Sequence, residues 1–349
     1  MQFYIPKSDI IKGIQWTSER LGYPEPDVKG DTYPMTWGPD GDIYTSSGDP
    51  CWGESMSGLD FERFVGGPTD YKIIKQNEMH DFVGWGGNGP KPTGMICVDG
   101  MLYLAVQNLR RMQRPPFGIN CQHGSDAHII HASTVWKNWS PAFANIDKQL
   151  MFPGSAFGGP AFVNFGQNNA DARDGYVYAC SADQWDNGSN LRLGRVPKDR
   201  VMDRSVWEFV CAYNPDGTPA WSNNLDLSIP VLSVHRHIST PELVYLKSIN
   251  RYLLFTWRLH EDFMPNGTDL FIYEAPEPWG PFSLAHAELD WEGAEQDPRF
   301  GPYCPRLPLK WIESDGQTCW LQFSGSWGEA GQSKNYYRSS VRQFKLLMK

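Results

Sequence analysis

The sequence has little charge and no long apolar segment. Only 20% of its 349 residues are charged, and the formal net charge is −9. Because nucleic-acid affinity comes largely from lysine and arginine side chains that neutralise phosphates, we expect no nucleic-acid partner. No run approaches the ~18 apolar residues that a membrane-spanning helix needs, so we expect a soluble protein without membrane contact. The start MQFYIPKSDI lacks a signal peptide's apolar core, and export would require that a leader had been removed, so the compartment stays open.

Cysteine is also scarce. The chain has seven cysteines, an odd number, without Cys-x-x-Cys spacing. This pattern indicates neither a disulfide framework nor a zinc knuckle. Histidines cluster in CQHGSDAHIIHAS, but Ile129 and Ile130 indicate a strand, in which His128 and His131 would face opposite sides. We therefore predict no metal site from these histidines.

Turn-forming and aromatic residues are abundant instead. Glycine contributes 34 residues and proline 27, and aromatic residues make up 14% of the chain, which is typical of an all-β protein. The segment MTWGPDGDIYTSSG contains an apolar run, the turn Asp40-Gly41 and a second run, and so predicts a β-hairpin. Four later segments follow the same plan, with the turn residues Gly100, Gly175, Asn250 and Gly316.

The hairpins recur at nearly equal intervals. Their turn residues are roughly 60 to 75 positions apart, and the interval from Gly316 through the C-terminus round to Gly41 has a similar size. Further strand-like runs follow the hairpins, as in HIIHASTVWKNW and LFIYEAPEPW. We therefore predict one domain over residues 1–349, a five-bladed β-propeller with four-stranded antiparallel blades, closed by N- and C-terminal strands. A β-sandwich with fortuitous spacing is the alternative.

Two acids lie at the ends of the first hairpin. If Pro39-Asp40-Gly41 forms the loop, Asp31 faces Asp49 at the end of the propeller away from the turn. Directly opposed like charges destabilise a sheet, which suggests that the pair has a function. Close carboxylates have separated pKa values, and glycoside hydrolysis uses one carboxylic acid as proton donor and one carboxylate as base or nucleophile. The alternative is that both residues only shape turns.

The same construction places other residues at this end of the channel, which we call the mouth. Glu242, in STPELVY, is a candidate proton donor, and the alternative is that it pairs with a nearby arginine. Strand starts and ends also place Lys91, Thr93, Asn108, Ser239, Trp257 and Arg306 there. Aromatic side chains suit the mixed surface of a sugar ring. The candidate substrate-binding residues are His80, Trp85, Asp183, Trp185, His235, Arg258, Lys310 and Trp327.

Two other functions fit this arrangement. A histidine such as His80 or His235, beside a tyrosine or arginine, would serve a polysaccharide lyase acting next to a uronate carboxylate. A non-catalytic carbohydrate-binding propeller would keep the aromatic residues without needing the acids. The hydrolase chemistry requires no metal or other cofactor, although a structural calcium ion could occupy the central channel.

Several motifs resemble a known family. DTYPMTWGPDGDIYTSSGD, DGYVYACSADQW, STPELVYLKSINRYLLFTW and CPRLPLKWIESDGQTCWLQFSGSW resemble, in order, the propeller proteins of glycoside hydrolase family 183, endo-acting D-arabinofuranosidases. The resemblance runs from about Asp31 to the C-terminus and implies cleavage of a furanose-containing, arabinan-type polysaccharide. It also implies that Asp31 and Asp49 are the essential carboxylates, and a distant likeness to family 43 implies a third acid, for which Glu242 is the candidate. CWGESMSGLD replaces that family's usual Gly-rich loop after the second Asp.

Overall fold

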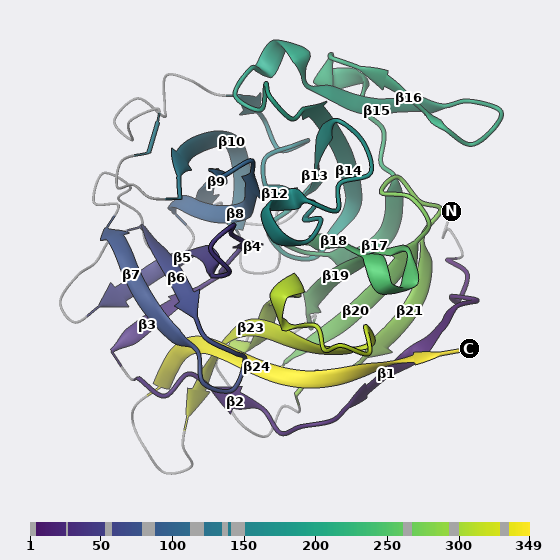
Figure 1. The fold of residues 1–349 in the computed structure, drawn as a ribbon. Helices are drawn as coiled ribbons and strands as arrows, with labels where there is room; N and C mark the ends of the chain where they lie inside the picture. The colour runs from purple at the N-terminus through teal and green to yellow at the C-terminus, as the bar shows by residue number, and fades with distance from the viewer. Residues whose placement is uncertain are drawn as a thin grey trace.

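The computed structural model confirms the all-β prediction. It describes residues 5–25, 27–52, 58–78, 88–111, 122–134, 139–140, 151–260, 267–292, 300–328 and 335–349. Five antiparallel sheets surround a central axis as the blades of a β-propeller, and Figure 1 shows them in a view along that axis. Within the described residues, no helix is long and apolar enough to span a bilayer.

The blades follow one another along the chain. The first comprises β3 (Val28–Asp31), β4 (Met35–Trp37), β5 (Ile43–Trp52), β6 (Leu59–Val65) and β7 (Lys72–Glu78). The second comprises β8 (Gly89–Val98), β9 (Met101–Arg111), β10 (Gln122–Ser133) and β11 (Phe152–Pro153). The fourth comprises β18 (Glu242–Leu246), β19 (Arg251–Leu259), β20 (Thr268–Ala275) and β21 (Ser283–Glu288).

The third blade is larger than predicted. Its main path comprises β12 (Pro160–Phe162), β13 (Tyr176–Ala182), β14 (Gly188–Pro197), β15 (Glu208–Tyr213) and β16 (Pro219–Ser222). A further strand, β17 (Leu232–Ile238), pairs with β14. The blade therefore has six strands, and β15 and β16 project from the ring (Figure 1).

The two ends of the chain close the circle, as predicted. The fifth blade comprises β22 (Phe300–Arg306), β23 (Thr318–Gly328), β24 (Asn335–Met348), β1 (Ile11–Trp16) and β2 (Leu21–Gly22). The N-terminal strand β1 pairs antiparallel with the C-terminal strand β24. Because this pairing joins the first and last parts of the chain, the N-terminal segment supplies an outer strand to the last blade.

The predicted turn residues lie where the hairpins reverse. Gly41, Gly100 and Gly316 have φ values of 91°, 79° and 68°, and Asn250 has a φ of 52°. Glycine adopts this left-handed region without strain, and asparagine tolerates it better than most residues. Gly175 directly precedes β13. These turns mark the end of the propeller opposite the mouth, which we call the turn end.

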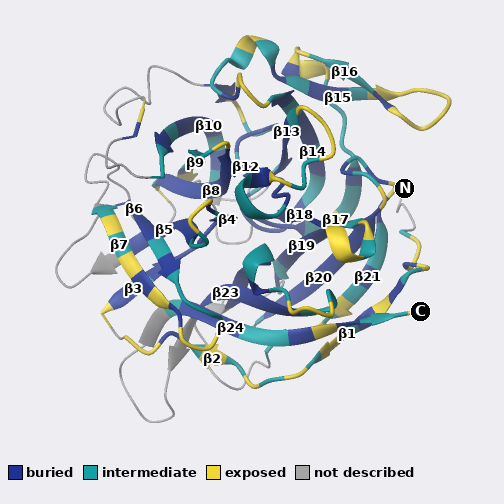
Figure 2. Cartoon of the chain, viewed as in Figure 1, coloured by how far each residue is buried: buried dark blue, intermediate teal, exposed yellow. Residues whose placement is uncertain are grey.

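The core lies between the blades. Strands β9 and β19 contain the apolar runs MLYLAV and RYLLFTW, and most of their residues are buried on both faces (Figure 2). Close approach between blades requires small residues at some positions. A Cβ atom on Gly94 of β8 would lie 2.6 Å from the Pro160 carbonyl oxygen of β12, so only glycine fits there.

Asn164 holds the first strands together at the axis. Its Nδ2 donates to the carbonyl oxygens of Met35 and Met95, at 3.2 and 3.0 Å, and its Oδ1 accepts from the Thr36 hydroxyl at 2.8 Å. Its backbone carbonyl accepts from the Tyr245 N–H. Asn164 follows the first strand of the third blade, so its side-chain amide links that blade to the first and second, and its backbone carbonyl links it to the fourth.

Candidate functional site

The mouth brings together side chains from four blades at one level. Asp31 ends β3, Lys91 lies in β8, Glu242 begins β18 and Arg306 ends β22. Each lies well away from the hairpin turn of its own blade along the strand. Asp31, Lys91, Glu242 and Arg306 therefore lie at the same end of the propeller, away from the hairpin turns.

Arg306 connects the two sides of this site. Its Nη1 lies 3.2 Å from the Glu242 Oε2 and 3.1 Å from the Pro241 carbonyl oxygen. Its Nε donates to the Thr32 carbonyl oxygen at 2.9 Å, directly after Asp31. Its Nη2 is buried without a hydrogen-bond partner among the described residues. The predicted alternative for Glu242, a pairing with a nearby arginine, is therefore present.

Glu242 is a buried carboxyl group. It is 5% exposed, and this burial raises its pKa to about 7, against the opposing effects of Arg306 and of a backbone N–H at Leu307. A carboxyl group with a pKa near neutrality carries a proton for a large part of the time at neutral pH and can donate it. Glu242 thus has the protonation behaviour of a general acid.

Asp31 is held by a tight turn and by a tyrosine. The Tyr33 N–H donates to the Asp31 carbonyl oxygen at 2.8 Å, which closes a three-residue turn with Thr32 at a φ of 65°. The Tyr303 hydroxyl donates to the Asp31 Oδ2 at 3.0 Å. A Cβ atom on Gly48 would lie 2.5 Å from the Asp31 Oδ1, so the absence of a side chain at Gly48 makes room for this carboxylate.

Asp49 forms a buried ion pair with Lys91 of the next blade. The Lys91 Nζ contacts the Asp49 Oδ1, and the two side chains are 2% and 10% exposed. A buried carboxylate is strongly favoured in its ionised form by a cation in direct contact. The Lys91 aliphatic chain also lies beside Gly48, because a Cβ atom there would be 3.2 Å from the Lys91 Cδ. Lys91 thus contacts Asp49 and borders the space that Asp31 occupies.

The predicted opposition of the two aspartates is wrong by one residue. The register places Val28 opposite Trp52 and Lys29 opposite Cys51, as predicted, but an irregularity follows and Asp31 faces Gly48. The prediction paired residues outward from the Pro39-Asp40-Gly41 loop and assumed that no residue is left unpaired. A β-bulge breaks that assumption and shifts the pairing by one position. Asp31 and Asp49 are therefore neighbours at the mouth and do not form a directly opposed pair.

Some of the strained backbone positions of the chain lie next to these residues. Thr32, Tyr33, Asp49 and Cys304 are non-glycine residues with φ values of 65°, 38°, 47° and 51°. Such conformations cost roughly 1–3 kcal/mol each and persist only where the surrounding structure fixes them. Their gathering next to Asp31, Asp49 and Arg306 is typical of a functional site.

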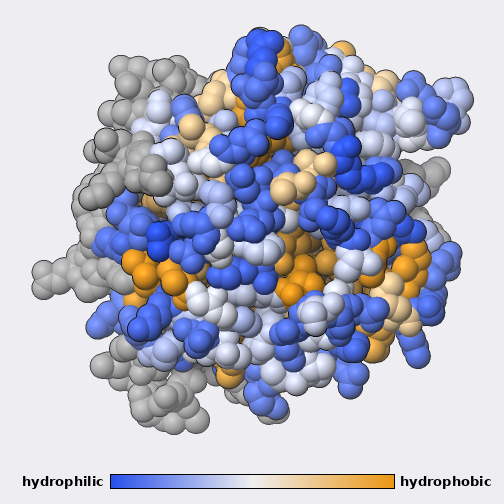
Figure 3. Space-filling view, in the orientation of Figure 1, coloured by the Kyte–Doolittle hydropathy of each residue, from blue (hydrophilic) through white to orange (hydrophobic). Residues whose placement is uncertain are grey.

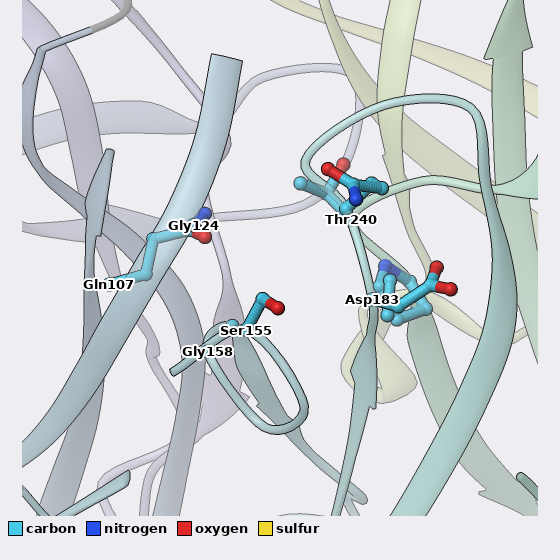
Figure 4. Close-up of a pocket in the computed structure, with 10 residues that line it drawn as sticks. Gln107, Gly124, Ser155, Gly158, Asp183 and Thr240 are labelled. Carbon is cyan, nitrogen blue, oxygen red and sulfur yellow. The ribbon is translucent and has the colours of Figure 1, made fainter. Parts of the chain in front are cut away.

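A small pocket lies between the second, third and fourth blades. Its cavity volume is about 10 Å³, which is room for about one water molecule, and it is lined by Gln107, Gly124, Ser155, Gly158, Gly159, Ala182, Asp183, Gln184, Thr240 and Pro241. Figure 4 shows Gln107 and Gly124 on one side and Asp183 and Thr240 on the other. Pro241 directly precedes Glu242 in the chain, although Glu242 itself is not among the lining residues. The Nε2 of Gln107 is buried without a hydrogen-bond partner among the described residues.

The predicted substrate-binding residues have different outcomes. Asp183 lines the pocket, but its carboxylate accepts hydrogen bonds from the Ser189 N–H at 3.0 Å and the Asn190 Nδ2 at 2.8 Å, and so stabilises its own turn. Trp185 is only 5% exposed, which corrects the prediction that its ring is available to a sugar. Lys310 lies in the short 3-10 helix η6 (Leu309–Trp311), on the turn side of Arg306. Lys310 therefore lies away from the mouth, and its assignment to substrate binding stays a prediction.

Arg258 and His235 lie at the mouth end of the third and fourth blades. The Arg258 Nε donates to the Asp269 Oδ2 at 2.6 Å, and its side chain remains one-third exposed. His235 is exposed on β17. His237, two residues later, is built into the blade, with its ring stacked 3.9 Å from that of Phe271. His80 and Trp85, and the side chain of Trp327, lie outside the described residues.

The described residues contain no cluster of side chains that could together bind a metal ion. Among the described residues, no group of three or more His, Cys, Asp and Glu side chains is close enough to hold a metal ion. The described cysteines Cys97, Cys180, Cys211, Cys304 and Cys319 are free thiols. A calcium ion in the channel, bound through backbone or amide oxygens, stays a prediction.

No protein-family model matches the sequence, and no curated protein sequence matches it. Solved structures do resemble the fold. A protein from Bacteroides ovatus described as a hydrolase has 13% identity and a TM-score of 0.55, over 93% of this chain and 87% of that chain. An α-L-arabinanase from Cellvibrio cellulosa, complexed with arabinohexaose, has 12% identity and a TM-score of 0.51, over 91% of each chain.

An α-L-arabinofuranosidase from Podospora anserina, in complex with cellotriose, is similar over nearly its whole length. It has 11% identity and a TM-score of 0.51, over 96% of this chain and 98% of that chain. At such identities the likeness shows the fold alone. Glycoside hydrolases are therefore among the proteins that share this propeller fold.

Proposed function

We infer that the chain is a glycoside hydrolase that cleaves an arabinose-containing polysaccharide at the mouth of the propeller. The observation that carries this proposal is the arrangement around Arg306. This one side chain contacts the buried carboxyl group of Glu242, whose pKa is about 7, and the backbone beside the carboxylate Asp31. A protonated carboxyl group beside an ionised one is the division of labour that glycoside hydrolysis requires.

The residues take distinct roles in this proposal. Glu242 donates its proton to the glycosidic oxygen as the bond to the leaving sugar breaks. Asp31 acts as the base that deprotonates the attacking water, or as the nucleophile. Asp49, which contacts Lys91, favours the positive charge that develops on the sugar ring in the transition state. The limited exposure of the three acids strengthens these electrostatic effects.

The choice of substrate rests on chemistry and on likeness. The small pocket that includes Pro241 is lined by hydroxyl, amide, carboxylate and glycine backbone groups, which can hydrogen-bond to the hydroxyl edge of a neutral sugar. Two structures of similar fold belong to enzymes that act on arabinose-containing glycans, one of them with arabinohexaose. The resemblance to family 183 also favours a polymer of arabinofuranose as the substrate. Because that family is endo-acting, we expect cleavage within the polymer chain.

Release of reducing ends from linear arabinan, a galactan and a uronate-containing polysaccharide tests the proposal. We expect release by the wild type and a loss of about 10²-fold or more in Asp31→Asn and Glu242→Gln. Asp315→Asn is the matched control, since it removes an exposed carboxylate in the turn of the fifth blade. Products that absorb in the near ultraviolet would indicate a lyase instead. Binding without any release by the wild type would indicate a carbohydrate-binding module.

A further inference from the structure

The third blade carries a second candidate binding site, far from the acids. The blade has six strands, two more than the four of a typical propeller blade. Between the β15–β16 hairpin and the turn-end parts of β13 and β14 lies an open groove of about 520 Å³. It is lined by Tyr176, Pro197, Ser205, Val206, Glu208, Trp221, Ser222 and Asn223. Since Tyr176 directly follows the hairpin turn at Gly175, the groove lies at the turn end, opposite the mouth.

The aromatic rings of the groove are fixed in place. The Arg195 Cζ lies 4.3 Å from the ring centroid of Tyr176 and 4.1 Å from that of Trp221, so the guanidinium group joins the two rings. Arg195 is itself held by Glu208, whose Oε2 lies 3.0 Å from its Nε and 2.9 Å from its Nη2. Trp221 also packs edge-to-face on Trp279, with ring centroids 6.4 Å apart. A ligand would therefore meet a preorganised platform, which lowers the entropic cost of binding.

The lining matches the chemistry of a neutral sugar chain. Trp221 and Tyr176 supply half-buried aromatic surface, and Glu208, Ser222 and Asn223 supply donors and acceptors beside it. The charges of Arg195 and Glu208 balance one another, and Glu208 is the only charged residue among those that line the groove. Hydrophobic residues on this face of the molecule come to the surface in separate patches among hydrophilic ones (Figure 3). The coloured part of this view therefore shows no large apolar patch of the kind that binds another protein.

We propose that this groove is a second, non-catalytic carbohydrate-binding site, which holds a neutral arabinose-containing polysaccharide while the mouth cleaves the same polymer. The identity of the ligand rests on the proposed function, whereas the existence of a binding site rests on the lining and geometry of the groove. Two sites at opposite ends of one molecule give the enzyme a higher apparent affinity for a long chain than the mouth alone would give. The gain applies to polymers and disappears for short oligosaccharides.

Calorimetric titration with arabinohexaose tests this site, with turnover suppressed by Glu242→Gln. We expect two equivalents to bind, and we expect Trp221→Ala in the same background to bind one, with the groove affinity reduced about tenfold or more. Trp221→Phe, which keeps an aromatic ring, is expected to retain the second equivalent. Tyr213→Ala is the matched control, because Tyr213 is an exposed aromatic residue of β15 outside the groove lining.

Activity separates this inference from the proposed function. Trp221→Ala, without the Glu242 substitution, is expected to hydrolyse arabinohexaose at the wild-type rate and to lose binding to insoluble arabinan. Thermal melting establishes that each variant is folded. One equivalent for Glu242→Gln alone, or an unchanged second equivalent after Trp221→Ala, overturns the groove site. A second equivalent that depends on Trp221 in a protein without hydrolase activity supports the groove and contradicts the proposed function.

Discussion

The Nη1 of Arg306 lies 3.2 Å from the Oε2 of Glu242, while the Nε of the same guanidinium group holds the carbonyl oxygen that follows Asp31. Arg306 is fully buried, and its planar group fixes the separation between the two halves of the site. The candidate acid comes from the fourth blade and the candidate base from the first, so the geometry between them depends on this side chain of the fifth blade. Substitution of Arg306, Glu242 or Asp31 is therefore expected to impair catalysis.

The activity of the wild type should fall as pH rises through about 7. Burial raises the pKa of Glu242 to about 7, and a general acid that has lost its proton cannot protonate the leaving oxygen. The measurement is kcat/KM for arabinan between pH 5 and 9, which reports the pKa of groups in the free enzyme. A profile that stays flat to pH 9 would contradict the role of Glu242 as the acid.

The unfolding free energy should also depend on the titration of Glu242, and it should fall as pH rises. The ordinary pKa of Glu242 is 4.5 and its folded-state pKa is about 7, so the folded protein retains a proton that the unfolded chain loses between these values. Its contribution to stability is fully present below about pH 4.5 and is lost as pH rises through about 7. Glu242→Gln lacks this titration. The unfolding free energy of the wild type relative to Glu242→Gln should therefore fall by on the order of 3 kcal/mol between pH 4.5 and 8.

Denaturant titrations of both proteins at several pH values measure this difference. The subtraction removes the titration of all other groups, which the two proteins share. A constant difference across the range would show that Glu242 titrates in the folded protein as it does in the unfolded chain.

Lys91→Met should destabilise the protein by about 3–5 kcal/mol, because it leaves the buried Asp49 carboxylate without its cation. Asp49→Asn in the same chain removes the uncompensated charge and should recover much of that loss. Denaturation of the two single variants and the double variant completes the cycle. Additive effects would show that the two groups do not interact.

Gly48→Ala should impair activity more than stability. The added Cβ atom would lie 2.5 Å from the Asp31 Oδ1 and 3.2 Å from the Lys91 Cδ, so the carboxylate must move. A displacement of that size in a catalytic group can lower kcat about 10²-fold. Gly41→Ala is the control for loss of a glycine, because no atom lies within 4 Å of its Cβ position, although its φ of 91° adds some backbone strain. Wild-type kcat in Gly48→Ala would show that Asp31 is not held where the structure places it.

Much of the fold follows from local signals in the sequence. The Asp-Gly and Asn turns, the apolar strands on either side and their regular spacing predicted five blades and the closure by β1 and β24. The outer strands of the third blade were not predicted, because β15 to β17 lie beyond the repeating hairpin and do not share its spacing. Pairing of β17 with β14 depends on tertiary contacts that no local pattern shows.

The site was predicted less completely. Asp31 and Asp49 were chosen because like charges at the ends of one hairpin destabilise a sheet, Glu242 because it begins a strand at the same end of the propeller, and the family resemblance implied all three. The bulge after Lys29 was not visible to a count that assumes a regular ladder, and it changes the partner of Asp31 to Gly48. Tyr303 was missed since its hydroxyl reaches Asp31 across the chain closure, from a residue 272 positions away.

The most direct test of the central claim compares arabinan hydrolysis and arabinohexaose binding in the wild type, Asp31→Asn and Glu242→Gln. The account predicts that both variants lose about 10²-fold or more in kcat while still binding the oligosaccharide at the mouth. Hydrolysis that persists at the wild-type rate in either folded variant would contradict the assignment of that carboxylate to the reaction.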